Sequence, residues 1–384
     1  MIILGIESSC DETAASLIET KGDKIKVVSN VVSSQIKIHA PYGGVIPELA
    51  ARNHIKDILP VIDEALKTSP LTPLLINEMG TILLCPLLTK ERVPKAGEVK
   101  VDAIIVTTGP GLVSSLLIGI ETAKALAYAW QKPLIGVNHL AGHIYGNFIG
   151  NIKKIEFPAL ALVVSGGHTE LVLMRGHFKF KLLGQTRDDA AGEAFDKAAK
   201  ILNLGYPGGP IIASTAIKIP NSKSQIPKIN LPRPMINDDN FDFSFSGLKT
   251  SLLYQVQKDA DWKNKTSAYC AEFQQAVIDV LVAKTIKAAK KYKVKTVMLA
   301  GGVAANLELR EQLGLAVKLG FKTQHNSPSY HVPDLKYTTD NAAMIAAAGY
   351  FLHKSMRTLK HENIKTKMQA TKKIKVDCNA RLTN

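Results

Sequence analysis

Short apolar runs alternate along most of this chain with longer segments of helical period. The apolar runs predict strands at residues 2–6, 13–18, 101–107, 133–137, 159–164, 170–174 and 294–300. Segments of helical period predict helices at residues 48–67 and 114–130, from 189–196 to about 205, from 307 to about 319, and from 342 to about 352. Strands that alternate with helices in this way predict an α/β protein.

The same order of elements occurs twice. In the first half, two strands enclose the polar turn Glu7–Glu12, and a later buried strand leads through the glycine turn Thr108–Leu112 into a helix. In the second half, two strands enclose Ser165–Thr169, and a later strand leads through Gly301–Asn306 into a helix. This duplication predicts two similar lobes with a cleft between them, lined by glycine turns and suited to a nucleotide-like ligand. Glycine in such turns lets backbone N–H groups approach an anion, although many turns carry it only for geometry.

We therefore divide the chain into three parts. Residues 1–157 form the predicted N-terminal lobe, and residues 158–335 form the second lobe. Residues 336–384 form a terminal helix, which carries Asp340, and a basic tail. Within the first lobe, residues 70–100 combine prolines with mixed apolar and charged residues and have no clear period, so we expect an inserted surface loop there.

The composition is that of a globular protein. The chain has 384 residues, of which 46% are hydrophobic and 21% charged, which is enough for two domains with their own cores. No apolar run reaches the length of a membrane span, and a strand begins at the first residues, so we expect a cytoplasmic protein without a leader. The four cysteines have no paired spacing, which suggests neither a disulfide framework nor a cysteine metal site.

The net charge of +15 points to a polyanionic partner. Residues 351–384 contain nine Lys or Arg against two acidic residues, nearly half of the excess. Lysines 284, 287, 290, 291, 293 and 295 form a second basic run. Either run alone is typical of a solvated surface, but the two together favour an RNA partner.

The clearest candidate for chemistry is the pair His139 and His143. Four residues apart on a helix, their imidazoles lie on one face and can hold one cation, and they directly follow a predicted strand. The alternative is two histidines that merely share a turn. The spacing is that of the zinc-protease His-Glu-x-x-His, but Leu140 stands where that mechanism needs its glutamate, so this mechanism is excluded.

Three carboxylates are further candidates. Asp340 precedes the Ala-rich helix, where it is either an N-cap or the third ligand of a His₂-carboxylate site. Asp11 and Glu12 are either the acid and base of a site or solvated acids of a turn. In addition, Phe241–Lys249 alternates aromatic and polar residues, so one side can pack while the other meets a ligand or RNA.

Several motifs, in this order, resemble one known family. They are Ile6–Thr13, His139–His143, Val164–Thr169, Asp189–Asp196, Ser244–Lys249 and Gly301–Asn306. The family is that of the universal tRNA N6-adenosine threonylcarbamoyltransferases, formerly described as O-sialoglycoprotein endopeptidases. The resemblance covers nearly the whole chain except residues 70–100.

The resemblance implies a duplicated, two-lobed actin-like ATPase/sugar-kinase (ribonuclease-H-like) fold. It implies transfer of a threonylcarbamoyl group from threonylcarbamoyl-AMP to N6 of the adenosine beside the tRNA anticodon. One iron or zinc ion per subunit is expected on His139, His143 and Asp340. Expected substrate-binding residues are Val163, Val164, Ser165, Gly166, Gly167, Asp196, Gly209 and Asn306.

The resemblance also implies partners. They are tRNA, a paralogous subunit, a small ATPase subunit and a synthase that supplies the adenylate, with ATP as a further nucleotide and no membrane. For the proton that leaves N6, the chemistry points to Asp11 or Glu12 as the acceptor.

Three other functions compete with this one. A sugar or small-molecule kinase of the same fold would need acidic Mg²⁺ ligands and has no use for the histidine pair. A metalloprotease lacks its glutamate. A non-catalytic scaffold would be expected to have lost the metal ligands, and this chain keeps all three. We therefore expect a transferase.

Overall fold

The computed structural model describes two compact units. The described residues are 1–22, 24–67, 101–217, 229–321, 327–359 and 374–382. Unit 1 comprises Met1–Lys37, Val45–Lys153 and Asp340–Leu382, and unit 2 comprises Ile38–Gly44 and Lys154–Thr339. The predicted insertion at residues 70–100 and residues 360–373 of the basic tail lie outside the described residues. The predicted lobe boundaries and cleft stay predictions.

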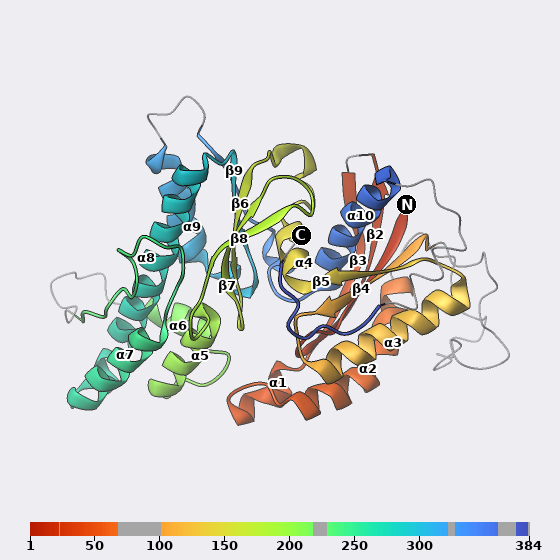
Figure 1. Cartoon of the computed structure of the whole chain (residues 1–384). Helices are drawn as coiled ribbons and strands as arrows, with labels where there is room; N and C mark the ends of the chain where they lie inside the picture. Colours follow the sequence, from red (N-terminus) through yellow and green to blue (C-terminus); the bar gives the residue numbers. More distant parts are fainter. Residues whose placement is uncertain (23, 68–100, 218–228, 322–326, 360–373, 383–384) are drawn as a thin grey trace. The chain divides into compact units, whose positions relative to one another are not determined.

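Unit 1 is built on a five-stranded sheet (Figure 1). Its strands, in the order β3-β2-β1-β4-β5, are β3 (Lys24–Ser34), β2 (Glu12–Lys21), β1 (Ile2–Glu7), β4 (Ala103–Gly109) and β5 (Leu134–Asn138). The first three are antiparallel, whereas β1, β4 and β5 run parallel. The helices are α2 (Pro47–Lys67), α3 (Val113–Trp130), α4 (His139–Gly146) and α10 (Ala342–Leu359), with the short α1 (Ile36–His39) following β3.

Alternation along β1 decides which helices cover which face of this sheet. Leu4 and Ile6 are fully buried and pack with apolar residues of α2 and α3. Gly5, between them, faces the opposite side of the sheet, where a Cβ would lie only 2.4 Å from the carbonyl oxygen of Ala342. The missing side chain of Gly5 therefore lets α10 lie directly on the second face.

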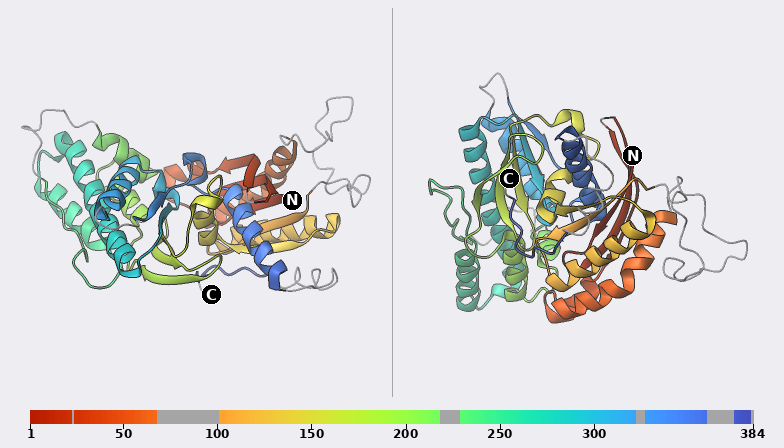
Figure 2. Two further views of the ribbon diagram at one scale, coloured as in Figure 1. Left: turned by 90° about the horizontal axis from the view of Figure 1, so that it is seen from above. Right: turned by 45° about the vertical axis from the view of Figure 1, so that its right-hand side comes forward.

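Unit 2 repeats this plan. Its strands, in the order β10-β9-β6-β7-β8, are β10 (Ser329–His331), β9 (Thr296–Ala300), β6 (Ala159–Val164), β7 (Thr169–Met174) and β8 (Phe180–Gln185). Its α-helices are α5 (Ala191–Ile201), α6 (Gly208–Ala216), α7 (Ser246–Lys258), α8 (Thr266–Tyr292) and α9 (Leu307–Gly320) (Figure 2). Short 3-10 turns lie at Ala40–Tyr42, Ile152–Lys154, Trp262–Lys265, Gly302–Ala305 and Leu335–Tyr337. None of the described helices combines the length and hydropathy that a membrane span requires.

The predicted duplication is confirmed by the strand order. In each sheet an antiparallel three-stranded meander pairs through its first strand with two parallel strands, so β1 corresponds to β6 and β4 to β9. The strands β3, β8 and β10 were not predicted. The helix predicted to end near residue 205 ends at Ile201 instead. Just beyond this end, Asn203 and Gly205 take positive φ angles of 55° and 100°.

The second basic run is not uniformly a surface feature. Lys284 lies on α8 with 0% exposure, and its Nζ donates a hydrogen bond of 2.9 Å to the carbonyl oxygen of Asn240. Lys287 Nζ donates to the carbonyl oxygen of Asp238 at 2.8 Å. The expectation that the whole run faces RNA is therefore wrong for Lys284, which ties α8 to the loop that precedes α7.

The contact of Gly5 with α10 predicts a stability defect. Gly5→Ala would drive a methyl group into a backbone carbonyl, and overpacking of this kind costs about 1–3 kcal/mol. We expect thermal unfolding of this variant to fall by several degrees. Gly44→Ala is the matched control, because a Cβ there meets no atom within 4 Å. Equal melting temperatures for the two variants would contradict the packing described for α10.

Candidate functional site

The histidine pair lies on a short helix whose start is fixed by its own cap. Asn138 ends β5, and its Oδ1 accepts hydrogen bonds from the N–H groups of Leu140 (2.9 Å) and Ala141 (3.1 Å). Both histidines of α4 are buried, with ring centroids 4.6 Å apart. The predicted strand-to-helix placement of the pair is confirmed.

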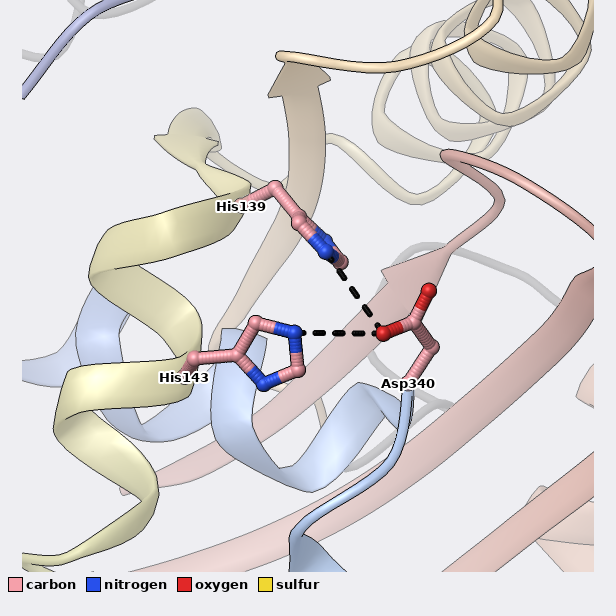
Figure 3. Close-up of side chains that lie close together, drawn as sticks. All are labelled: His139, His143 and Asp340. Atoms are coloured by element: carbon pink, nitrogen blue, oxygen red, sulfur yellow. Dashed lines mark ion pairs between the residues drawn. The ribbon is translucent and has the colours of Figure 1, made fainter. Parts of the chain in front are cut away.

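Asp340 meets the two histidines from the entrance of α10 (Figure 3). Its Oδ1 lies 3.5 Å from His139 Nε2 and 3.2 Å from His143 Nε2. The residue that caps α10 is Asn341, whose Oδ1 accepts from Met344 N at 3.0 Å. The alternative that Asp340 is this N-cap is therefore wrong, and its carboxylate faces the histidines.

Gly142 sets how closely the two helices approach. A Cβ at this position would lie 2.5 Å from Cδ1 of Ile345 on α10 and 3.4 Å from Cγ of Met344. Gly142 lies between the two histidines on α4, and Ile345 lies in the first turns of the helix that Asp340 precedes. The glycine therefore brings the carboxylate within reach of both imidazoles.

Glu7 completes this cluster and was not predicted. It is fully buried, and its Oε2 lies 3.1 Å from His139 Nδ1 and accepts a 2.6 Å hydrogen bond from Thr107 Oγ1. Its Oε1 accepts from the N–H of Ser9 at 2.6 Å. The only signal in the sequence is its place at the end of a buried strand, where β1 passes into the polar turn.

The surrounding buried charges shift the pKa values of the two imidazoles in opposite directions. Burial alone lowers the pKa of His139, but the charges of Asp340 and Glu7 and the hydrogen bond to Glu7 raise it to about 9. For His143, burial lowers the pKa and its contact with Asp340 offsets only part of that effect. Glu7 has a lowered pKa, because His139 outweighs the opposite effect of burial.

These donor atoms fit a cation. One ligand atom from each of His139, His143 and Asp340 lies within 4.8 Å of the others. Ligands about 2.0–2.2 Å from a tetrahedral ion are about 3.3–3.6 Å from one another, close to the two Nε2–Oδ1 distances. His143 Nε2 is buried with no hydrogen-bond partner among the described residues, although Asp340 Oδ1 is 3.2 Å away. Glu7 would orient His139 as outer carboxylates commonly orient metal-bound histidines.

Asp11 and Glu12 lie where the turn after β1 enters β2. Burial, the charge of Asp340 and the charge of Asp11 together raise the pKa of Glu12 well above its usual value. Ser34 Oγ donates to Glu12 Oε1 at 3.4 Å. Asp11 is also buried. The catalytic role of the two acids stays a prediction.

The glycine turn before α3 does not offer its N–H groups to an anion. Gly111 N donates to the carbonyl oxygen of Cys378, and Leu112 N donates to that of Ser9. A Cβ on Gly109 would lie 1.7 Å from the carbonyl oxygen of Asp377. Gly109 therefore serves close packing against residues 374–382, and Gly111 serves close packing against Ser9, whose carbonyl oxygen would lie 2.4 Å from a Cβ there. This is the geometric alternative for such turns.

The predicted substrate residues gather in unit 2 around the ends of β6 and β9. Val163 and Val164 are buried on β6, and a Cβ on Gly301, after β9, would lie 2.3 Å from the carbonyl oxygen of Val164. Asp196 Oδ1 accepts from Gly208 N at 2.7 Å and so fixes the start of α6. Asn306 caps α9 through Leu309 N.

Packing separates the glycines of these loops into two groups. A Cβ on Gly192 would lie 2.6 Å from the carbonyl oxygen of Ser165, and one on Gly208 would lie 2.4 Å from that of Phe195. At Gly166, Gly167 and Gly209 a Cβ would meet no atom within 4 Å, and none of the three has a positive φ. Neither packing nor backbone conformation requires glycine at these three positions.

The aromatic–polar motif at residues 241–249 packs as predicted. Phe241, Phe243 and Phe245 are buried, whereas Asp242 pairs with Arg187 at 2.9 Å. Asp188 Oδ2 accepts from Ser244 Oγ (2.5 Å) and Ser246 Oγ (2.6 Å). The polar side of the motif therefore binds its own chain.

A comparison with protein families identifies the chain. The family model described as tRNA N6-adenosine threonylcarbamoyltransferase matches residues 26–78 and 94–347. The chain belongs to this family. The gap between the two matched stretches, residues 79–93, falls within the predicted insertion at 70–100. The resemblance seen in the motifs is thereby confirmed.

Curated members of the threonylcarbamoyltransferase family align over nearly the whole chain. The tRNA N6-adenosine threonylcarbamoyltransferase of Dehalococcoides mccartyi strain CBDB1 is 49% identical over 351 residues, covering 91% of this chain and 93% of the relative. That of Syntrophomonas wolfei is 46% identical over 352 residues, covering 91% and 92%.

Solved structures of distant proteins share the fold. The crystal structure of T. kodakarensis HypF matches with a TM-score of 0.52 at 13% identity, over 92% of this chain and 48% of that one. Full-length HypF in its phosphate- and nucleotide-bound form matches with a TM-score of 0.53 at 13% identity, over 92% and 46%. Together with the duplicated sheets, these matches confirm the actin-like ATPase/sugar-kinase fold.

The raised pKa of His139 predicts that metal binding releases a proton. At pH 7 the metal-free His139 is protonated, because its pKa is about 9. A cation needs the neutral imidazole, so binding should release close to one proton, and apparent affinity should rise about tenfold per pH unit between pH 6 and 8. Titration calorimetry with Zn²⁺ in buffers of different ionisation enthalpy measures both quantities.

Glu7→Gln tests the cause of this linkage. Removing the charge of Glu7 should move the pKa of His139 down towards 6.5. Metal binding at pH 7 should then release fewer protons, and the apparent metal affinity should depend less steeply on pH. Affinity should also fall about 10–100-fold. Glu48→Gln is the control, because Glu48 is an exposed partner of Arg52. The double variant His139→Ala/His143→Ala should not bind the ion. Unchanged proton release in Glu7→Gln would refute the coupling.

Proposed function

We propose that this chain transfers a threonylcarbamoyl group from threonylcarbamoyl-AMP to N6 of the adenosine beside the tRNA anticodon. The observation that carries the proposal is the convergence of His139, His143 and Asp340 in a chain of this family. In the reaction, the carbamoyl carbon forms a bond to N6 and breaks its bond to the phosphate oxygen. AMP leaves, and N6 loses a proton.

Unit 1 carries the candidate metal centre. The exocyclic amine is a weak nucleophile because its lone pair is delocalised into the ring, so the carbonyl must be activated. An iron or zinc ion held by His139, His143 and Asp340 would supply Lewis-acid polarisation of that carbonyl. Glu7 keeps His139 oriented through Nδ1, and Gly142 maintains the approach of Asp340.

The proposed adenylate-binding residues all lie in unit 2. The N–H groups of Gly166 and Gly167 donate to no described residue, so they are available to phosphate oxygens. Gly209 lies in the first turn of α6, where the helix N-terminus favours an anion. Asp196 fixes that helix start. Val163, Val164, Ser165 and Asn306 shape the same loops and complete the proposed set.

Asp11 or Glu12 is the proposed acceptor of the N6 proton. A base is most effective when its pKa lies near the working pH, and the raised pKa of Glu12 moves that carboxyl in this direction. The nearby charge of Asp340 contributes to the shift, so a bound cation and the base would influence one another.

A paralogous subunit is the proposed protein partner, bound at an apolar groove between α2 and α3. The groove encloses 380 Å³ and is lined by residues that include Ile55, Ile118 and Trp130. Ile55 is 65% exposed and Leu117, on α3, is 44% exposed. A small ATPase subunit and a synthase for the adenylate complete the proposed system. A cytoplasmic location is part of the proposal, because it is consistent with a tRNA-modifying family.

Product analysis tests the function directly. Purified chain, partner subunits, threonylcarbamoyl-AMP and tRNA should yield threonylcarbamoyladenosine, detected by mass spectrometry after nuclease digestion. His139→Ala should lower the rate at least about 100-fold, because the carbonyl loses its activation. Asp63→Ala removes only a surface ion pair and is the control. Sugar phosphorylation without any modified nucleoside would favour the kinase alternative.

The two groups of glycines give a second test. Gly167→Ala should fold normally but raise the KM for the adenylate about tenfold or more, because its methyl group occupies space next to the phosphate. Gly192→Ala should instead lower the melting temperature, because its Cβ meets the backbone of Ser165. An unchanged KM in a well-folded Gly167→Ala protein would remove this loop from the adenylate site.

A further inference from the structure

The connection from β7 to β8 combines three cations with two aromatic rings. Arg175, Phe178, Lys179, Phe180 and Lys181 line a cavity of 550 Å³ on unit 2. The three basic residues are exposed, Phe178 is half-buried and Phe180 is buried. This volume is within the range of about 300–1,000 Å³ that is typical of small-ligand pockets.

The positive charge around this cavity is not neutralised by nearby acids. Arg175, Lys179 and Lys181 form no ion pair with any of the residues that the structure describes. By contrast, other cations of unit 2, such as Lys197 and Arg233, each contact two carboxylates. The cavity therefore presents unbalanced charge to a ligand from solution.

Phe178 is held in an unfavourable backbone conformation. Its φ is 56°, in the left-handed region that bulky residues rarely adopt. The turn is closed by hydrogen bonds from Arg175 N to Lys179 O (3.0 Å) and from Lys179 N to Gly176 O (3.1 Å). The ring lies 5.8 Å from that of Phe180 in a T-shaped arrangement. Strain at an aromatic residue beside a cavity is typical of a site with a function.

We propose that this hairpin binds an unpaired segment of the tRNA, with one base in the cavity against Phe178 and the neighbouring phosphates on Arg175, Lys179 and Lys181. Aromatic faces stack on any base, and cations beside them follow the backbone, which together favour single-stranded RNA over a purely acidic peptide. The inference rests on the proposed function, because that function supplies tRNA as the ligand.

Binding of tRNA across a salt series separates the two contributions. Phe178→Ala should raise the Kd about tenfold with an unchanged salt slope, because stacking carries no charge. Arg175→Gln/Lys179→Gln/Lys181→Gln should raise the Kd and reduce the slope by about 0.7 per lost contact to single-stranded RNA. Phe178→Leu keeps apolar volume without the ring and should behave like Phe178→Ala, which covers the case in which alanine prevents folding.

The matched control is a second basic hairpin. Lys21, Lys24 and Lys26, at the β2–β3 connection of unit 1, are exposed. Lys21→Gln/Lys24→Gln/Lys26→Gln changes the net charge by the same amount and should leave the Kd and slope nearly unchanged. Equal effects of the two triple variants, or full competition by polyglutamate at matched ionic strength, would overturn the assignment.

The transfer assay distinguishes this inference from the proposed function. If wild-type chain makes threonylcarbamoyladenosine and the hairpin variants show a raised KM for tRNA with an unchanged KM for the adenylate, the hairpin assignment is supported. If wild-type chain is active and the hairpin variants keep the wild-type KM for tRNA, the hairpin assignment fails alone. If wild-type chain makes no product in the complete system, the proposed function fails.

Discussion

The close packing of α10 against the sheet and against α4 of unit 1 is the constraint on which the candidate metal centre depends. Gly5 removes the Cβ that would strike Ala342, and a Cβ on Gly349 would lie 2.4 Å from the side chain of Ile105. Gly142 on α4 likewise lacks the Cβ that would strike Ile345 of α10. A helix held at three such points cannot shift without creating voids or clashes, since protein interiors are close-packed. The position of Asp340 is therefore set by apolar contacts rather than by the charges that it meets.

The buried charges of this cluster are costly to desolvate, and the cost is reduced because only one of the two histidines is protonated. The pKa values of His139 and His143 move in opposite directions, so one imidazole is charged between two carboxylates while the other is neutral. Glu7 also receives hydrogen bonds from Thr107 and Ser9. A divalent cation would replace the proton on His139 and balance the same carboxylates, so the site is arranged for positive charge in either state.

Local patterns predicted what depends on local structure, and they missed what depends on distant contacts. The spacing of His139 and His143 and the repeated strand–turn–strand unit were visible because each is encoded within a few residues. Glu7 was missed because only folding brings it beside a histidine 132 positions away. The sequence left open whether Asp340 caps α10 or faces the histidines, because Asp340 and its neighbour Asn341 are both good caps. The sequence alone could not separate Gly167 from Gly192, since only the surrounding atoms show which glycine packing requires.

The C-terminal segment has a consequence for how the protein is divided and handled. Residues 374–382 lie beyond the part that the family model matches, which ends at residue 347. Yet Ala380 accepts a hydrogen bond from the side chain of Asn138, the residue that caps the histidine helix, and Cys378 accepts one from Gly111. A fragment that ended at residue 347 would keep every candidate metal ligand and lose these acceptors. Unit 1 therefore extends at its C-terminal end beyond the last residue that the family model matches, and a tag or fusion at this end would adjoin residues that support the candidate metal centre.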